Sequence, residues 1–352
     1  MQIRENISLK PYNTFAVDAK ARYFSSFNSV DMLHEILEQS LTKLKVTPNS
    51  KLRTPNSQLV LGGGSNILFT TDFDGLVLKN EIKGIEVVKE DDDHVYIKVG
   101  AGENWHQFVL HCLQHNYAGV ENLSLIPGNV GASPMQNIGA YGVEIKDVFH
   151  ELEAFYLNEK TNCTFSLNDC EFGYRDSVFK GRFKDQFVIT CVTYRLNKRP
   201  VFNINYGALK QELERMNVQK LRIQIISQAV INIRSSKLPD PAVLGNAGSF
   251  FKNPQIPKHE FHELKRMYPN MPSFPVNEIS VKVPAGWLIE QCGWKGYRKG
   301  DAGCYEKQAL VLVNYGNATG KEIYELSEKI AQSVKQKFGV RLEREVNIIP
   351  AA

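Results

Sequence analysis

LIPGNVGASPMQNIGAYG, residues 125–142, is the stretch that decides what kind of fold this chain can adopt. It holds four glycines and two prolines but no charged residue. A surface loop is usually polar, and a core helix does not tolerate this much Gly and Pro. The composition favours irregular backbone pressed against a ligand. Glycine permits close approach and positive φ, and it leaves N–H groups to donate to phosphate.

A second glycine-rich segment lies upstream, where LGGGSN (residues 61–66) follows the apolar pair Leu59-Val60. Two such segments predict one extended dinucleotide that is held from two sides. The alternative is a pair of tight turns, for which glycine is equally suited.

Length and composition limit the class of protein. A chain of 352 residues is long enough for two or three domains, and its 43% hydrophobic and 23% charged residues are ordinary for a globular protein. The net charge of +4, from 42 basic and 38 acidic residues, is too small to predict a nucleic-acid partner.

Targeting signals are not evident. The segment MQIRENISLKPYNTF lacks the apolar core of a signal peptide, and no apolar run approaches the roughly eighteen residues of a membrane span. The six cysteines form no C-x-x-C pair, so free thiols are expected. We therefore expect a soluble, cytoplasmic protein without a membrane partner.

Apolar spacing predicts a mixed α and β chain. Helices are expected at residues 30–41, 105–114, 207–216, 222–234, 259–267 and 321–338. Strands are expected at 59–63, 66–69, 75–80, 95–99, 145–157, 186–196 and 310–314, with a closing strand at 340–346. Residues 42–57, rich in Lys, Pro, Asn and Ser, predict a loop, and KLPDP (237–241) predicts a linker because its prolines stop a helix.

Several common motifs are absent. The sequence has no P-loop, and both Gly62-x-Gly64 and Gly100-x-Gly102 lack the third glycine of a Rossmann fingerprint. The sequence also lacks the G-x-S-x-G motif, so Ser249 is not expected to be the nucleophile of a hydrolase. His111 and His115 have the spacing of one helix face, but no carboxylate cluster lies near them in the sequence, so no metal site is expected.

Seven motifs in order give the chain a family resemblance. They are LGGGSN (61–66), IPGNVGASPMQNIGAYG (126–142), GYRDS (173–177), KLPDP (237–241), GNAGSFFKNP (245–254), AGWLIEQCGWKG (285–296) and LEREV (342–346). Together they resemble the UDP-N-acetylenolpyruvoylglucosamine reductases, and the match spans nearly the whole chain. Tyr206, in NINYGAL, resembles the type of this family with a substrate-capping tyrosine loop.

The resemblance implies an α+β fold with a two-lobed FAD-binding region of the vanillyl-alcohol-oxidase type and a third, α/β substrate-binding domain. The implied domains are a first FAD lobe (1–78), a second lobe that includes Tyr206 (79–236), a substrate domain (237–341) and a C-terminal strand that returns to the active site (342–352).

The resemblance also implies a reaction. NADPH reduces FAD, and hydride from flavin N5 reduces the enolpyruvyl double bond of a UDP-sugar to give UDP-N-acetylmuramate for peptidoglycan. The family pattern makes Ser249 the proton donor and places Arg175 and Glu345 at the substrate carboxylate. Taken alone, Ser249 would more often be a helix cap or a turn serine, and the motif reverses that preference. The alternative for Arg175 and Glu345 is a surface ion pair.

Binding residues follow from the same pattern. Tyr206, Lys237, Asn253 and Gln291 match UDP-binding positions, Tyr174 is expected to pack near flavin or substrate, and Arg234 is a further basic candidate. The expected FAD-binding residues are Gly62, Gly63, Gly64, Ser65, Asn66, Pro127, Gly128, Gly131, Ser133, Gln136, Asn137 and Ile138. Residues 59–66 contain no His or Cys, so the flavin is expected to be non-covalent.

Two other classes of protein remain open. One is an oxidase of the same fold that passes electrons to oxygen, which GNAGSFFKNP and LEREV argue against. The other is a non-catalytic nucleotide-binding module, for which a colourless preparation that binds UDP-sugars would be typical. The expected partners are a UDP-sugar and NADPH, and the protein is expected to be a monomer.

Overall fold

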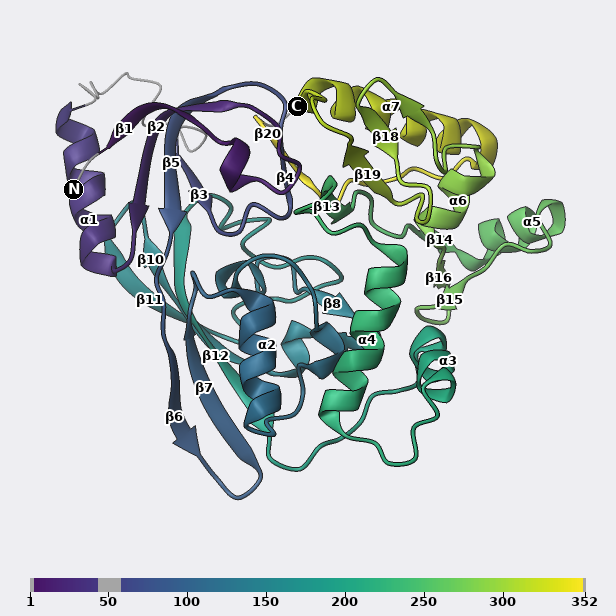
Figure 1. Cartoon of the computed structure of the whole chain (residues 1–352), viewed down its shortest axis with the longest axis horizontal. Coiled ribbons are helices and arrows are strands. Elements are labelled where there is room, and N and C mark those ends of the chain that lie inside the picture. Colours follow the sequence, from purple (N-terminus) through teal and green to yellow (C-terminus); the bar gives the residue numbers. More distant parts are fainter. Residues whose placement is uncertain (1–2, 44–57, 351–352) are drawn as a thin grey trace. The chain divides into compact units, whose positions relative to one another are not determined.

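The computed structural model describes residues 3–43 and 58–350 (Figure 1). Most of the loop predicted at 42–57 lies outside the described residues. The chain divides into two compact units. The first unit is Met1–Ile7, Ala21–Gly63 and Asp74–Ser236, and the second is Ser8–Lys20, Gly64–Phe73 and Lys237–Ala352.

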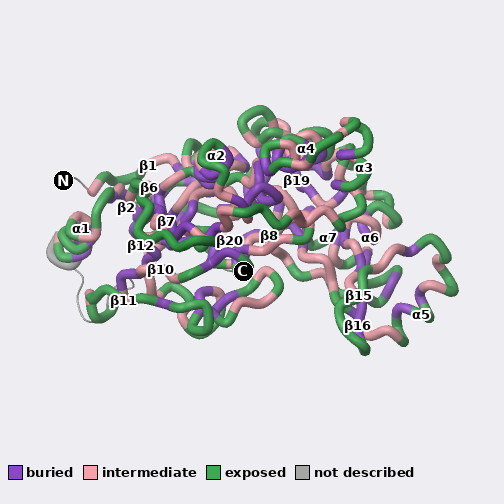
Figure 2. The backbone as a smooth tube through the Cα atoms, turned by 90° about the horizontal axis from the view of Figure 1, so that it is seen from below, coloured by how far each residue is buried: buried purple, intermediate pink, exposed green. Residues whose placement is uncertain are grey.

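A five-stranded antiparallel sheet forms the centre of the first unit, with strand order β11-β10-β12-β7-β6. Its strands are β6 (Ile85–Glu90), β7 (His94–Gly100), β10 (Phe149–Tyr156), β11 (Thr161–Ser166) and β12 (Phe187–Asn197). Helix α2 (Trp105–Gln114) packs on one face through Trp105, Phe108 and Val109, which are all buried. In Figure 2 buried positions gather along strands such as β7.

A four-stranded sheet of order β1-β2-β5-β3 lies beside helix α1 (Val30–Lys43). Its strands are β1 (Arg4–Ser8), β2 (Lys20–Phe27), β3 (Gln58–Leu61) and β5 (Phe73–Asn80). β3 runs parallel to β5, with Leu61 opposite Lys79. Both strands therefore point their carboxyl ends the same way, which is where ligands bind in parallel sheets.

Residues 125–142 form very little regular structure, as their glycine content predicts. Nearby are the short helices η4 (Glu121–Leu123), η5 (Val130–Ala132) and η6 (Ile145–Asp147), and the two-residue strands β8 (Gly139–Ala140) and β9 (Val143–Glu144). The first unit ends in the helices α3 (Gly207–Arg215) and α4 (Ile223–Lys237), which bury Leu209 and Leu213 against Ile226 and Val230.

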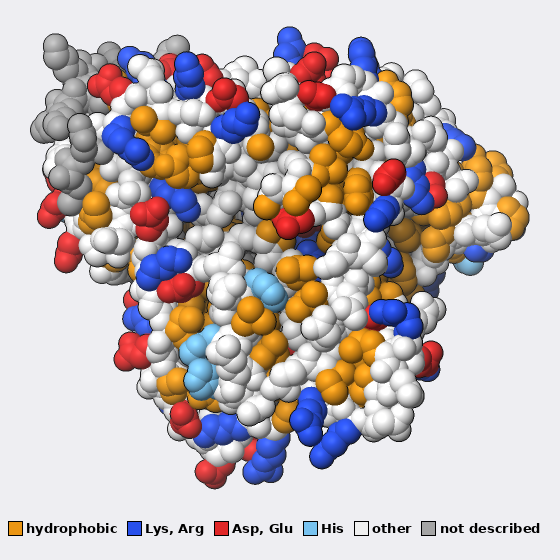
Figure 3. Space-filling view, viewed as in Figure 1, with side chains coloured by type: hydrophobic (Ala, Val, Ile, Leu, Met, Phe, Trp, Pro, Cys, Tyr) orange, Lys and Arg blue, Asp and Glu red, His pale blue; other side chains and the backbone are white. Residues whose placement is uncertain are grey.

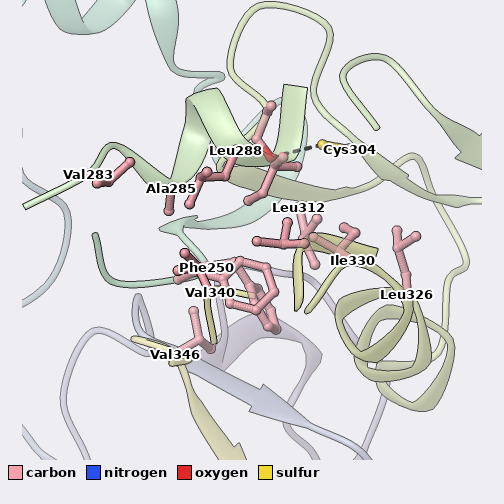
Figure 4. Close-up of a cluster of buried hydrophobic side chains, with 14 of the residues drawn as sticks. Phe250, Val283, Ala285, Leu288, Cys304, Leu312, Leu326, Ile330, Val340 and Val346 are labelled. Carbon is pink, nitrogen blue, oxygen red and sulfur yellow. Dashed lines mark hydrogen bonds between the residues drawn. The ribbon is translucent and has the colours of Figure 1, made fainter. Parts of the chain in front are cut away.

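The second unit is built on a sheet of order β13-β19-β18-β17. Its strands are β13 (Gly245–Ser249), β17 (Arg298–Lys299), β18 (Ala302–Cys304) and β19 (Val311–Asn314). Helices α6 (Ala285–Gln291) and α7 (Gly320–Phe338) cover a core that includes Phe250, Leu312 and Ile330 (Figure 4). The dashed line in Figure 4 marks the Cys304 thiol donating to a backbone carbonyl at 2.9 Å.

Smaller elements complete the second unit. Strand β4 (Ile67–Phe69) pairs in parallel with β20 (Asn347–Ile349), and η1 (Lys10–Tyr12) is a short helix. Strands β14 (Gln255–Pro257), β15 (Phe274–Pro275) and β16 (Ser280–Lys282) form a three-stranded sheet next to α5 (Lys258–Met267).

All six predicted helices are confirmed, with ends shifted by at most a few residues. The predicted closing strand at 340–346 is wrong in position, because the strand is β20, Asn347–Ile349. Within 340–346 only Arg344 forms an isolated bridge, to Phe251. The predicted strand at 145–157 begins later, at Phe149, because residues 145–147 form the short helix η6.

Charges of both signs are interspersed over the face shown in Figure 3. No described helix is long and apolar enough to cross a membrane. Within residues 3–43 and 58–350, no group of three or more His, Cys, Asp and Glu side chains is arranged to hold a metal ion.

Candidate active site

The two glycine-rich segments meet within the first unit. A Cβ added to Gly63 would lie 2.8 Å from the Gly128 Cα and 2.8 Å from the Asn129 Oδ1, closer than real Cβ atoms approach. The Asn129 Nδ2 donates to the Gly102 carbonyl at 2.8 Å, which ties the second segment to the 100–102 turn. The backbones at Gly63 and Gly128 therefore pack together more closely than side chains would allow.

The first glycine-rich segment fits a dinucleotide such as FAD. The Gly63 N–H donates to no other residue in the described part of the chain, so it remains free to bind an anion. Phosphate is the natural ligand for backbone N–H groups in such a glycine-rich loop. Gly128, with φ of +114°, has a conformation that L side chains rarely adopt.

Two of the expected flavin-site residues, Ser133 and Asn137, have side chains that are hydrogen-bonded to other residues of the chain. The Ser133 hydroxyl bonds to the Tyr194 hydroxyl at 2.6 Å, where burial raises the pKa of Tyr194 and keeps its proton. The Asn137 Nδ2 donates to the Gly173 carbonyl at 2.9 Å and to the Glu144 carboxylate at 3.0 Å. Both residues are buried, and their side chains therefore shape the loop.

Arg175 lies at the tip of a tight turn closed by the bridge between Gly173 and Asp176. Its φ is +54°, an uncommon value for an arginine and a conformation found at functional turns. The guanidinium donates to the carbonyls of Asn137, at 3.4 Å, and Gly139. The structure thus brings Arg175 onto the segment expected to hold the flavin, while the neighbouring Tyr174 is 37% exposed.

Tyr206 contacts a residue that the sequence motifs did not single out. Its ring meets Tyr141 edge to face, with centroids 5.4 Å apart. The Tyr141 hydroxyl lies near the Arg234 guanidinium, whose Nε donates to the Leu125 carbonyl at 3.2 Å. Burial raises the pKa of Tyr141 and lowers that of Arg234. Tyr141 belongs to the quoted 125–142 stretch, so its position there was the available signal.

His106 holds the start of the same stretch. Its Nδ1 accepts the Leu125 N–H at 3.0 Å, which requires the neutral ring. Burial, and then the nearby charge of Arg234, lowers the pKa of His106 from its ordinary value of 6.5.

We expect the protein to lose stability as the pH falls below 6.5, because the unfolded chain then binds a proton that the folded His106 refuses. Above 6.5 this contribution is fully present. Thermal midpoints of the wild type and of His106→Asn across that range measure it. The variant should show a shallower decrease, and identical profiles would contradict the assignment.

Ser249 ends strand β13 in the second unit. The strand is irregular between Asn246 and Ser249, where the Asn246 Oδ1 accepts the Gly248 N–H at 2.9 Å. Phe250 follows, fully buried, and packs edge to face on Phe251 with centroids 5.3 Å apart. Ser249 is half-buried, and its hydroxyl bonds to no other residue that the structure describes.

Glu345 lies beside this serine segment. The Glu345 N–H donates to the Phe250 carbonyl at 2.9 Å, and the Glu345 carbonyl accepts from the Asn66 Nδ2 at 3.2 Å. Three motifs that are far apart in the sequence, around Asn66, Ser249 and Glu345, therefore converge in the second unit. Gly64, at the start of the first of them, has φ of +63° and packs against the Tyr12 carbonyl.

The expected UDP-binding residues of the second unit do not converge in the same way. The Asn253 Oδ1 accepts the Ala285 N–H at 2.9 Å, at the start of α6, whereas Gln291 is exposed at the other end of that helix. The seven residues of α6 give the helix a length of about 10 Å. Lys237 is exposed at the end of α4.

Known proteins match this chain from end to end. It is 49% identical over 350 residues to the UDP-N-acetylenolpyruvoylglucosamine reductase of Flavobacterium johnsoniae, and the alignment covers 99% of this chain and 100% of that protein. It is 51% identical over 349 residues to the reductase of the same name from Amoebophilus asiaticus, with coverage of 99% and 100%.

Domain families and a solved structure agree with these relatives. The family described as UDP-N-acetylenolpyruvoylglucosamine reductase, C-terminal domain, matches residues 240–349, and the family described as FAD binding domain matches residues 54–161. The crystal structure of UDP-N-acetylenolpyruvylglucosamine reductase from Thermus caldophilus has a TM-score of 0.68 at 23% identity, covering 99% of this chain and 100% of that one. This likeness confirms the expected α+β fold. The full-length relatives show that the chain belongs to the UDP-N-acetylenolpyruvoylglucosamine reductase family.

Proposed function

We propose that this protein uses NADPH and FAD to reduce the enolpyruvyl double bond of UDP-N-acetylglucosamine enolpyruvate, giving UDP-N-acetylmuramate. The observation that carries the proposal is the convergence of Ser249 and Glu345 beside the buried Phe250. In this role the protein is a cytoplasmic monomer that serves peptidoglycan synthesis, and through it cell-wall biogenesis, cell shape and cell division.

FAD, when bound, supplies the hydride that the reduction needs. The chain's own residues supply the rest. Arg175 stabilises the negative charge that develops on the substrate carboxylate through its planar guanidinium. Glu345 polarises the same group in its protonated or paired form. Ser249 gives a proton to the carbon that bears the ether oxygen. A serine is a weak acid, so its position and the exclusion of water decide the rate.

Binding roles follow the same assignment. Tyr206, Lys237, Asn253 and Gln291 hold the UDP portion, and Tyr174 packs near the flavin or the substrate. Gly62, Gly63, Gly64, Ser65 and Asn66 hold FAD from one side. Pro127, Gly128, Gly131, Ser133, Gln136, Asn137 and Ile138 hold it from the other. We retain the division into lobes 1–78 and 79–236, a substrate domain 237–341 and a returning segment 342–352 as part of this proposal.

The purified protein tests the activity directly. We expect sustained NADPH consumption only when the enolpyruvyl nucleotide is added. Rapid NADPH consumption with oxygen alone would instead support an oxidase. A colourless protein that binds UDP-sugars without turnover would support a binding module.

We expect the flavin to be released by acid precipitation, because residues 59–66 offer neither His nor Cys for a covalent link. The yellow colour should appear in the supernatant, where its absorbance gives the stoichiometry. Colour that stays in the protein pellet would contradict non-covalent binding.

We expect Tyr206→Phe to weaken substrate binding by about tenfold or more, the usual effect of losing a hydrogen bond to a charged group. The ring would keep its contact with Tyr141, so any loss of affinity measures the effect of the hydroxyl group alone. Flavin reduction by NADPH should stay near the wild-type rate. Stopped-flow absorbance separates the two half-reactions, and an equal loss in both would rule out a substrate-capping role.

A further inference from the structure

Lys79 is hydrogen-bonded to the first glycine-rich segment. It lies near the end of β5, opposite Leu61 of the parallel strand β3, which continues directly into Gly62 and Gly63. The Lys79 Nζ donates to the Gly62 carbonyl at 2.7 Å. None of the sequence motifs includes this lysine.

This hydrogen bond fixes the direction of one peptide group. In a trans peptide the C=O and the following N–H point in opposite directions. Since the Gly62 carbonyl points to Lys79, the Gly63 N–H points away from it. That N–H donates to no other described residue, and Gly63 is the position that packs against Gly128.

Charged groups of both signs lie around Lys79. Lys79 is half-buried and forms no ion pair with a described carboxylate. The nearby Lys83 donates to the Gly102 carbonyl at 2.7 Å and pairs with Glu103 at 3.4 Å. Burial lowers the pKa of Lys79, Glu81 opposes that shift, and Lys83 adds to it.

We propose that Lys79 is a positioning residue for the diphosphate of FAD. It fixes the Gly62–Gly63 peptide with its N–H toward the anion, and its ammonium group balances the anion's charge from the opposite side. The isoalloxazine ring is neutral, so the effect of Lys79 falls on the phosphates. The proposal rests on the proposed function only in requiring that FAD binds.

Flavin binding to the apoprotein tests this role through a pair of ligands. FAD carries the diphosphate and riboflavin lacks it, and each is titrated by fluorescence quenching. We expect Lys79→Met to raise the Kd for FAD by about tenfold or more, and the Kd for riboflavin by less than about twofold. Lys79→Arg should restore most of the FAD affinity. Lys329→Met, an exposed lysine of α7, is the control for loss of a charge.

The dependence on salt gives a second measurement. Loss of one ammonium group near the diphosphate should make the increase of the FAD Kd with salt shallower in Lys79→Met. The same loss of affinity for both flavins, or an unchanged FAD Kd, would overturn the proposal. If Lys79→Met does not fold, Lys79→Gln provides the same comparison. Neither titration uses NADPH or the enolpyruvyl substrate, so a protein that binds FAD but lacks turnover would overturn the proposed function alone.

Discussion

Ser249→Ala should leave flavin reduction by NADPH near the wild-type rate and slow flavin reoxidation by substrate by about a hundredfold to ten-thousandfold. Only the second half-reaction needs a proton at carbon, and this change removes the hydroxyl that would supply it. The fold should survive, because the Ser249 hydroxyl bonds to no other described residue and Phe250 keeps its buried position.

Stopped-flow absorbance of the flavin follows each half-reaction in turn. Ser249→Cys is the chemical control, because a thiol can also give up a proton and should restore part of the rate. Reoxidation of the Ser249→Ala enzyme at the wild-type rate would show that another group is the donor. Arg175→Gln provides a contrast, since loss of the guanidinium should weaken both substrate binding and hydride transfer.

The spacing of apolar residues predicted the helices well, because a helix is stabilised by burying one apolar face and the sequence shows which residues form that face. In α7 the apolar spacing singled out Ile323, Ile330 and Val334, and all three are fully buried. The ends of α7 also have local causes: Thr319 forms a capping box with Glu322, and Gly339 ends the helix with φ of +72°.

Strands were harder to predict, because their partners decide them. GNAGS has little intrinsic tendency to form a strand, yet it becomes β13 through pairing with β19. The alternation at 340–346 suggested the closing strand, but the partner β4 aligns with Asn347–Ile349. A single sequence does not contain that register.

The candidate site divides in the same way. The glycine-rich segments were readable because glycine is needed where backbones approach closely, as at Gly63 and Gly128. Other contacts of the site join residues that are distant in the sequence. They are the contacts of Tyr141 with Tyr206 and Arg234, and the hydrogen bond from Lys79 to the Gly62 carbonyl. The local pattern places Tyr141 in the 125–142 stretch but does not predict which distant residues it contacts.

Gly320→Ala should destabilise the second unit by about 3 kcal/mol or more, an effect at the upper end of what one added methyl group causes. Gly320 is the first residue of α7, and a Cβ there would lie 1.7 Å from the Phe69 carbonyl oxygen and 2.6 Å from its carbonyl carbon. Both atoms are backbone of β4, so no side chain can rotate away, and α7 or β4 must move.

Gly207→Ala is the matched control, because Gly207 is also the first residue of a helix, α3, and has nothing within 4 Å of the added Cβ. There the change should be neutral or stabilise by up to about 1 kcal/mol, since alanine restricts the unfolded chain. Thermal and urea unfolding measure both variants. Equal stability of the two variants would contradict the close packing of α7 on β4.

Because β4 follows Asn66 and pairs with β20, movement of β4 should also disturb the contact of Asn66 with the Glu345 carbonyl. The Gly320→Ala protein should therefore lose activity at temperatures where it is still folded, whereas Gly207→Ala should not show that early loss.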